Sequence, residues 1–285
     1  VAAYPYLPKA RKWGEYTHNE LMRCVRKQVL DDGCCFERST RYTRLMGEML
    51  FFAGKCFAET PYKLPAEYFE RLSILGRFLD AVTNKDGRSL QVGDNDSGRV
   101  VCISPERYDD LRLVSRLVDR EIGPDAPDEA FFAEEELFYG ASGRVACFPS
   151  WRGGARTFYD AGMALARYGD WSLGFFASDG FVDESEPGHT HNDKLSFTLG
   201  FKGVPFFVDP GSGVYTRDPK VRNILRGTAQ HSTLRFGNLE QNEFRGLFGY
   251  TRCGGASLDV AEADGTVVFR GATDCWATRL GVTHK

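Results

Sequence analysis

The spacing of hydrophobic residues changes about half-way along this chain. In the first 140 residues they recur every three to four positions, the spacing of one buried face of an α-helix. After Gly140, short runs rich in aromatic and β-branched residues alternate with polar positions and are separated by Gly, Asp and Pro, as in antiparallel strands. The pattern predicts an α+β chain, with a helical domain at 1–140 and an antiparallel β-sandwich domain at 141–285.

The individual elements follow from the same spacing. We expect helices at 15–30, 39–59, 65–83, 105–121 and 128–139. Ser39, which follows an Asp-Asp-Gly loop, is expected to cap the second helix. Strands are expected at 143–148, 156–159, 163–168, 171–178, 195–201, 205–209 and 257–261, with an apparent last strand at 276–282. Short connections between helices fit either a bundle or an α/α toroid.

Composition narrows the class of protein. A chain of 285 residues can bury a large core and divide into two domains. Its net charge of -3 and pI near 6.0 give no general attraction for an anionic polymer, so nucleic acid is not an expected partner and an acidic ligand would need a local basic cluster. The sequence has no apolar run of 18 residues, so no membrane span is expected. The eight cysteines lack Cys-x-x-Cys spacing and are expected to be buried or idle thiols.

Three of the five histidines gather in one segment with aspartates and glycines. In an extended strand His189, His191 and Asp193 would point to the same face. Asp209 ends the next apolar run and His231 opens a later one, so two imidazoles and a carboxylate from three neighbouring strands would form a common zinc set. The alternative is that each histidine only caps a turn or binds a backbone carbonyl.

The order of motifs in this region resembles that of the heparinase II/III-like polysaccharide lyases. The motifs are His-x-His-x-Asp-x-x-Ser-Phe from His189, Gly-x-Pro from Gly203, Asp-Pro-Gly-x-x-x-Tyr from Asp209 and Arg-x-Thr-x-x-His-x-Thr from Arg226. Upstream, Asp-Gly-x-x-x-Glu-x-Ser-x-x-Tyr from Asp32 is similar to a segment of the helical domain in that family. The resemblance covers almost the whole chain and implies an incomplete (α/α) toroid before the sandwich.

The resemblance also implies roles for particular residues. Tyr42 would act as base and acid in β-elimination at a uronic acid, and His189 would face the substrate to neutralise its carboxylate or accept a proton. A structural zinc would bind His191, Asp209 and His231. The implied partner is an acidic polysaccharide and the implied location is the periplasm or the outside of the cell. The chain begins at Val1 and not at Met, and it ends just after the apparent strand at 276–282, so both ends are expected to be cut. The family's Asn or His ahead of the tyrosine is missing, so the chain as it stands is expected to be inactive.

Further residues are candidates for contact with the substrate. Glu37 could orient a partner or cap a helix, and Arg99 lies in an Asp-rich segment, Gly93–Arg99, that could be a turn or line the site; it lacks the last Glu of an EF-hand. Arg226, together with Arg217 and Arg222, could hold an acidic sugar, and Tyr215 and Trp171 could stack on sugar rings. Each of these residues could equally be a packing or solvated side chain.

Other functions remain open at this stage. A non-haem iron oxygenase would use His191, Asp193 and His231 as a facial triad, but it would leave the helical half without a role. A cupin-type binding module would need a Glu soon after His-x-His, where Leu195 and Ser196 stand. A non-catalytic carbohydrate-binding or exopolysaccharide-assembly protein of the same fold is the main alternative. Heparan-type glycosaminoglycan, alginate and a bacterial exopolysaccharide all fit as substrates.

Overall fold

The computed structural model describes residues 9–58, 60–84, 87–96, 98–100, 153–178, 188–251 and 254–285, together with Leu7, Leu111 and Trp151. The chain divides into two compact units. Unit 1 comprises Val1–Phe36, Thr43–Ser89 and Arg99–Trp151, and unit 2 comprises Glu37–Tyr42, Leu90–Gly98 and Arg152–Lys285. The expected boundary near 140 lies outside the described residues, as do the helices expected at 105–121 and 128–139 and the strand expected at 143–148.

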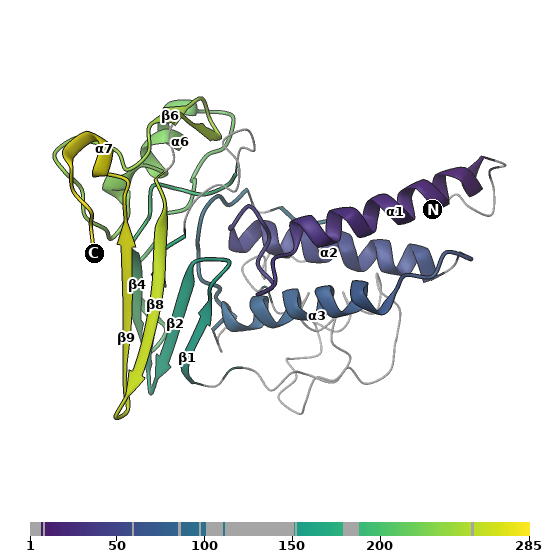
Figure 1. Cartoon of the computed structure of the whole chain (residues 1–285), viewed down its shortest axis with the longest axis horizontal. Helices are drawn as coiled ribbons and strands as arrows, with labels where there is room; N and C mark the ends of the chain where they lie inside the picture. The colour runs from purple at the N-terminus through teal and green to yellow at the C-terminus, as the bar shows by residue number, and fades with distance from the viewer. Residues whose placement is uncertain are drawn as a thin grey trace. The chain divides into compact units, whose positions relative to one another are not determined.

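Unit 1 is helical in the part that the structure describes (Figure 1). It contains α1 (Ala10–Gln28), most of α2 (Thr40–Ala58) and α3 (Ala66–Ala81). Helix α3 buries one face, on which Leu72, Leu75 and Leu79 recur and are almost fully shielded from solvent. In the turn after α1 the Leu30 N–H donates to the Cys34 carbonyl and the Phe36 N–H donates to the Gln28 carbonyl, which makes an isolated antiparallel bridge of Val29 and Cys35.

The start of α2 is fixed by its sequence. The hydroxyl of Ser39 accepts a hydrogen bond from the Tyr42 backbone N–H at 3.2 Å, which satisfies one of the unpaired donors of the first turn. The same hydroxyl donates to the backbone carbonyl of Asp94 at 2.8 Å. Because Ser39, Tyr42 and Asp94 all belong to unit 2, this cap joins the first turn of α2 to the residues of the candidate site.

Unit 2 is built on an antiparallel sheet in which consecutive strands pair in the order β1-β2-β3-β4-β5. The strands are β1 (Gly154–Phe158), β2 (Met163–Tyr168), β3 (Trp171–Phe176), β4 (Ser196–Phe201) and β5 (Val204–Phe207). Strand β2 lies between β1 and β3 and its first four residues are buried, whereas β5 is an edge strand with all four side chains exposed. The long connection before β4 and the one after β5 carry the histidine and aspartate residues of interest.

A long hairpin, β8 (Ala256–Ala263) and β9 (Thr266–Thr273), forms a second layer of the same unit (Figure 1). It packs on the sheet through Phe175 and Phe269, whose ring centroids are 6.4 Å apart. The layers separate toward the hairpin turn, where they leave a cavity of about 390 Å³ lined in part by Tyr168 and Trp171. Two layers of antiparallel strands after a helical half confirm the predicted α+β class.

The remaining described elements of unit 2 are short. They are α6 (Pro219–Leu225), the 3-10 helix η2 (Thr228–Gln230), the pair β6 (Phe244–Arg245) and β7 (Gly249–Tyr250), and α7 (Ala277–Leu280). Helix α6 is capped by Asp218, whose carboxylate accepts from the Lys220 and Val221 backbone N–H groups. These elements surround the connections that hold the candidate site.

Most of the expected elements within the described residues are present, with ends shifted by a few residues. The strand expected at 276–282 is wrong: this stretch contains α7 and a left-handed Gly281 at its C-cap. Trp276, at the start of that turn, is fully buried against Phe236, which explains an apolar run that is not a strand. Strand β9 and the pair β6–β7 were not expected.

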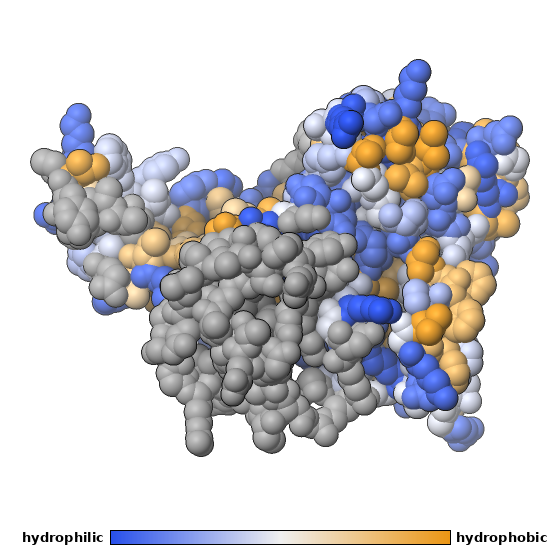
Figure 2. Space-filling model, turned by 180° about the vertical axis from the view of Figure 1, so that it is seen from behind, coloured by the Kyte–Doolittle hydropathy of each residue, from blue (hydrophilic) through white to orange (hydrophobic). Residues whose placement is uncertain are grey.

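The surface of the described residues carries apolar side chains on unit 2. Figure 2 shows hydrophobic groups gathered over the sheet unit. Val204, Phe206, Phe207 and Val208, in and beside edge strand β5, are each between 45% and 60% exposed. In the part of the chain that the structure describes, no helix is long and apolar enough to cross a membrane. The described cysteines, at 24, 34, 35, 56 and 275, are free thiols.

Candidate functional site

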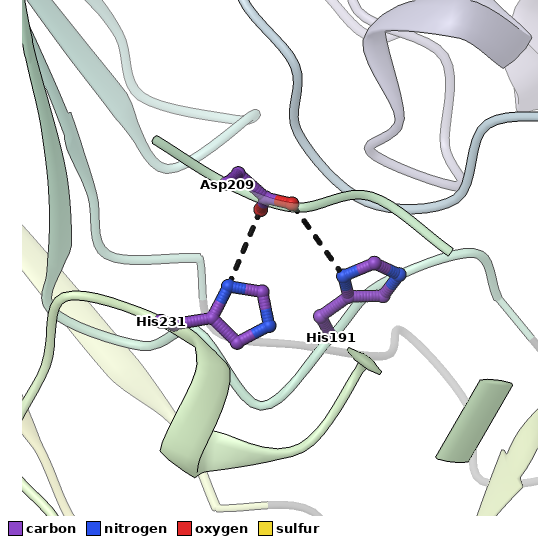
Figure 3. Close-up of side chains that lie close together, drawn as sticks. All are labelled: His191, Asp209 and His231. Atoms are coloured by element: carbon purple, nitrogen blue, oxygen red, sulfur yellow. Dashed lines mark ion pairs between the residues drawn. The ribbon is translucent and has the colours of Figure 1, made fainter. Parts of the chain in front are cut away.

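His191, Asp209 and His231 come together in unit 2 with the geometry of a metal site (Figure 3). One ligand atom from each lies within 4.8 Å of the others. Asp209 Oδ2 is 3.4 Å from His231 Nδ1, and Asp209 Oδ1 is 3.9 Å from His191 Nδ1. The side chains are at most 4% exposed. Two imidazoles and one carboxylate, close but not in contact, leave room for an ion between them.

The unpaired atoms of this cluster support a metal. His191 Nδ1, Asp209 Oδ2 and both ring nitrogens of His231 are buried without a hydrogen-bond partner. Buried polar atoms are rarely left unpaired, because each loses its hydration without compensation. Burial opposes ionisation of Asp209, but the neighbouring His231 and His191 hold the pKa of this carboxyl below its ordinary value. The donor set therefore fits a divalent cation such as zinc.

The three residues reach the cluster from connections rather than from strands. The segment from His189 to Asp193 is irregular and β4 begins only at Ser196, so the expected single face of a strand carrying His189, His191 and Asp193 is wrong. Asp209 follows β5, and His231 is the C-cap of η2. The expectation that three strands supply the ligands is wrong, because His191 precedes β4, Asp209 follows β5 and His231 ends a 3-10 helix.

A second cluster forms around Tyr42 and His189, also within unit 2. The two rings stack with their centroids 3.7 Å apart and an interplanar angle of 11°. Tyr215 joins them: its hydroxyl is 2.5 Å from the Tyr42 hydroxyl and 2.9 Å from His189 Nδ1. Phe248 meets the His189 ring edge-on at 5.7 Å. The Tyr215 hydroxyl is thus within hydrogen-bond distance of both Tyr42 and His189, whose rings stack on each other.

Carboxylates face these three rings. The Tyr42 hydroxyl donates to Asp96 Oδ2 at 2.9 Å, and His189 Nε2 is 3.4 Å from Glu37 Oε1. Burial, with hydrogen bonding to Tyr215 and Asp96, raises the pKa of Tyr42 well above its ordinary value. Burial likewise raises the pKa of Tyr215 to about 12 and raises the pKa of Glu37. Both phenols are therefore protonated in this arrangement.

Asp94 lies between the two clusters and is completely buried. Its Oδ1 is 3.0 Å from His191 Nε2, and its Oδ2 is 2.8 Å from His189 Nδ1. A guanidinium N–H of Arg222, itself fully buried, also donates to Oδ2. Burial by itself would raise the pKa of Asp94, but the hydrogen bonds from the histidines and the charge of Arg222 lower it below the ordinary value. Asp94 is therefore ionised.

Two of the expected substrate contacts have partners within their own units. Arg99 belongs to unit 1, where its side chain is 6% exposed and 3.4 Å from the carboxylate of Glu48. Arg226 is fully buried beneath Phe244 and Tyr250, and its guanidinium donates to backbone carbonyls of the β6–β7 turn. Trp171 is half exposed and tilts against Phe201. None of the three has a described contact with the Tyr42–His189 cluster.

Some site residues were not singled out from the sequence. Asp94 and Asp96 lie in the acidic segment for which the sequence left both a turn and a place in the site open. Arg222 was one of three equivalent cations, and only the fold shows that it meets Asp94 and lies 4.5 Å from the Phe248 ring. The available signal in the sequence was the acidic residues at alternate positions after Gly93. Gly93 itself adopts a φ of +70°, and its backbone lies against the His189 carbonyl.

Comparison with known protein families gives a match over most of unit 2. Residues 152–285 match the family described as Heparinase II/III-like, C-terminal. Residues 152–285 are a heparinase II/III-like C-terminal domain. This heparinase II/III-like domain contains His189, Tyr215 and the three metal-site residues, whereas Tyr42 and Asp94 precede it. No curated protein sequence matches the chain.

Solved structures extend the likeness in fold to almost the whole chain. A crystal structure of heparinase III matches 96% of it with a TM-score of 0.61 and 20% identity. The heparan sulfate lyase HepC of Pedobacter heparinus matches 96% with a TM-score of 0.59 and 19% identity. The chain spans only 43% and 41% of the length of these two proteins. At this identity the likeness establishes the heparinase III fold.

Proposed function

We propose that this chain is part of a polysaccharide lyase that cleaves uronic-acid-containing polysaccharide by β-elimination. The observation that carries the proposal is the stacked pair of Tyr42 and His189, with Tyr215 within hydrogen-bond distance of both. The heparinase II/III-like family match of residues 152–285 and the heparinase III fold support it. The expected substrate contacts of Arg99 and Arg226 are not part of the proposal, because both guanidinium groups are occupied within the protein.

The reaction requires three tasks. The carboxylate beside C5 of the uronate must be neutralised, so that the C5 proton becomes acidic and the developing charge is stabilised. A base must remove that proton, and an acid must protonate the leaving oxygen O4. No water is consumed, since the bond to O4 breaks as the C4–C5 double bond forms.

Tyr42 is proposed to be both base and acid. It is protonated at rest, so it must release its own proton before it can accept the one from C5. Its hydroxyl donates to Asp96 Oδ2, which can receive that proton. The C5 proton then passes to the Tyr42 oxygen and on to O4, and Asp96 returns the first proton to Tyr42. The same oxygen can serve both steps if C5–H and O4 lie on the same side of the sugar ring.

His189 is proposed to bind the uronate carboxylate. Because Asp94 is ionised and 2.8 Å from His189 Nδ1, a proton must lie between them and is placed on the imidazole. The other nitrogen, Nε2, faces Glu37. To donate to the uronate carboxylate, Nε2 must also carry a proton. Burial raises the pKa of Glu37, and this carboxyl group is the proposed source of that proton.

The metal is proposed to be zinc with a structural role. It would link the three connections that hold His191, Asp209 and His231, and it would supply positive charge to a buried cluster whose ligand atoms lack other partners. His189 lies next to this cluster in sequence but binds Asp94, Glu37 and Tyr215 instead. The tasks of metal binding and catalysis are therefore divided between His191 and His189.

The substrate would be an acidic polysaccharide met in the periplasm or outside the cell, as the resemblance implies. The net charge of -3 gives no general attraction for such a polymer, so recognition must be local. Heparan sulfate, alginate and a bacterial exopolysaccharide containing glucuronate all place a C5 proton beside a carboxylate. The name of the matched heparan sulfate lyase puts heparan sulfate first among the polymers to test.

The proposal is tested with the full-length protein and zinc, incubated separately with heparan sulfate, alginate and polyglucuronate. The ultraviolet absorbance of an unsaturated uronate should rise with at least one polymer, and mass spectrometry should find products lighter by one water than the hydrolysis products. Reducing ends without unsaturation would contradict elimination. If the absorbance rises with none of the polymers, although zinc and the polymer are bound, the non-catalytic carbohydrate-binding or assembly function would be favoured.

A further inference from the structure

The side chain of Asp94 contacts both clusters. It offers one carboxylate oxygen to His191 of the metal site and the other to His189 of the catalytic pair. A buried carboxylate is stable only when donors and counter-charge surround it, and here both are present. The hydrogen bonds to these two oxygens therefore stabilise the buried carboxylate and also connect the metal site to His189.

The hydrogen bond to His191 determines how that histidine can bind a metal. Asp94 Oδ1 is 3.0 Å from His191 Nε2, and Arg222 donates to the other oxygen of this carboxylate, so His191 Nε2–H is the donor to Oδ1. The other nitrogen, Nδ1, is left with its lone pair, buried, unpaired and 3.9 Å from Asp209. A carboxylate that fixes the tautomer of a ligating histidine also makes it a better ligand, and its removal typically weakens metal binding about 10- to 100-fold.

The backbone around Asp94 keeps the carboxylate in place. Its N–H donates to the His189 carbonyl at 2.7 Å, and its own carbonyl accepts from Ser39 in the first turn of α2. The next residue, Asn95, donates its N–H to the Ser212 hydroxyl at 3.0 Å. Asp94 is thus bound to the segment that carries His189, and to the cap of the helix that carries Tyr42.

We propose that Asp94 is a positioning residue that couples occupancy of the metal site to the orientation of His189. A cation on His191 Nδ1 withdraws electron density from the ring, so Nε2–H becomes a stronger donor and holds Oδ1 more firmly. Because the carboxylate is rigid, Oδ2 is held at the same time against His189 Nδ1 and Arg222. Only the task assigned to His189 rests on the proposed lyase function; the coupling itself does not.

The coupling predicts a signal that does not depend on activity. With ¹⁵N-labelled histidine the protein has five imidazoles, and the His189 signals can be assigned by their loss in His189→Gln. Adding Zn²⁺ to the zinc-free protein should shift the His189 ring nitrogens as well as those of His191 and His231. In Asp94→Asn, an amide cannot accept at both ends, so the His189 response to Zn²⁺ should disappear.

The zinc dissociation constant provides the second reading. Competition with a chromogenic chelator should give a value about 10- to 100-fold weaker for Asp94→Asn than for the wild type. The matched control is Asp96→Asn, two residues away, whose carboxylate contacts Tyr42 and not His191; its zinc affinity should be unchanged.

The proposal is overturned if folded Asp94→Asn binds Zn²⁺ as tightly as the wild type, or if the His189 ring nitrogens of the wild type do not shift when Zn²⁺ is added. The wild-type measurement decides the question even if the Asn variant does not fold. A protein that cleaves no polymer but shows both effects would disprove the lyase function and leave the coupling intact, so the two failures can be told apart.

Discussion

The imidazole of His189 stacks on the phenol of Tyr42, with ring centroids 3.7 Å apart. The two residues are far apart in sequence, and both belong to the same compact unit because Glu37–Tyr42 packs with the sheet. Stacking fixes the plane of each ring, while the Tyr215 hydroxyl reaches both. The proposed base and the proposed carboxylate-binding group would thus be oriented before any substrate arrives, which would lower the entropic cost of the reaction.

The zinc content of two alanine variants should distinguish the role of His189 from that of His231. His231→Ala removes a metal-site imidazole and should lose most of the bound zinc, whereas His189→Ala should keep it. Because an ion that binds only the folded state stabilises it, EDTA should lower the melting temperature of the wild type and of His189→Ala, but not that of His231→Ala. Elemental analysis and thermal unfolding provide the two measurements. Equal loss of zinc in both variants would show that the division of roles is wrong.

Arg226 should matter for stability rather than for substrate binding. Arg226→Met leaves the carbonyls of Gly246 and Gly249 without their donor and removes the contacts with two aromatic rings. An unsatisfied buried acceptor costs about 1–3 kcal/mol, so the free energy of unfolding should fall by that order. The control is Arg217→Met on the exposed surface, which should change it by less than about 0.5 kcal/mol. Equal unfolding midpoints for the two variants would contradict a packing role.

The carboxyl group of Glu37 should make the free energy of unfolding depend on pH. Its pKa is raised in the folded protein, mainly by burial, so the folded state binds more protons than the unfolded state between the two pKa values. The free energy of unfolding must therefore fall as the pH rises through this window. Glu37→Gln cannot ionise and should lack this decrease, so it should gain stability relative to the wild type between pH 4 and pH 7. Urea unfolding at both pH values checks this, and parallel profiles would rule it out.

Hydrophobic spacing was sufficient for the elements whose burial follows a regular period. The strand expected at 163–168 coincides with β2, because its two faces are both buried in the middle of the sheet. The stretch 276–282 failed, since Trp276 is buried from a turn and not from a strand. A period in the sequence reports burial, and long-range packing decides which backbone conformation provides it.

The candidate site shows the same limit. Its histidines were visible as a cluster, and the proximity of His191, Asp209 and His231 came with the family resemblance. Asp94 and Arg222 could not be chosen from the sequence, since acids and arginines are common and only the fold places these two against each other in the interior. For the same reason the sequence singled out Arg226 rather than Arg222 as a candidate site residue. The two arginines lie on neighbouring turns of one short helical segment, where both side chains are buried but have different partners.

The central claim is that the Tyr42 hydroxyl carries the proton in an elimination, and kcat of Tyr42→Phe tests it most directly. On the polymer that the wild type cleaves, the variant should lose roughly 10²- to 10⁴-fold in kcat while keeping its zinc and its melting temperature. Tyr159→Phe, at an exposed position, should match the wild type. A folded, zinc-bound Tyr42→Phe that releases unsaturated uronate at the wild-type rate would contradict the account.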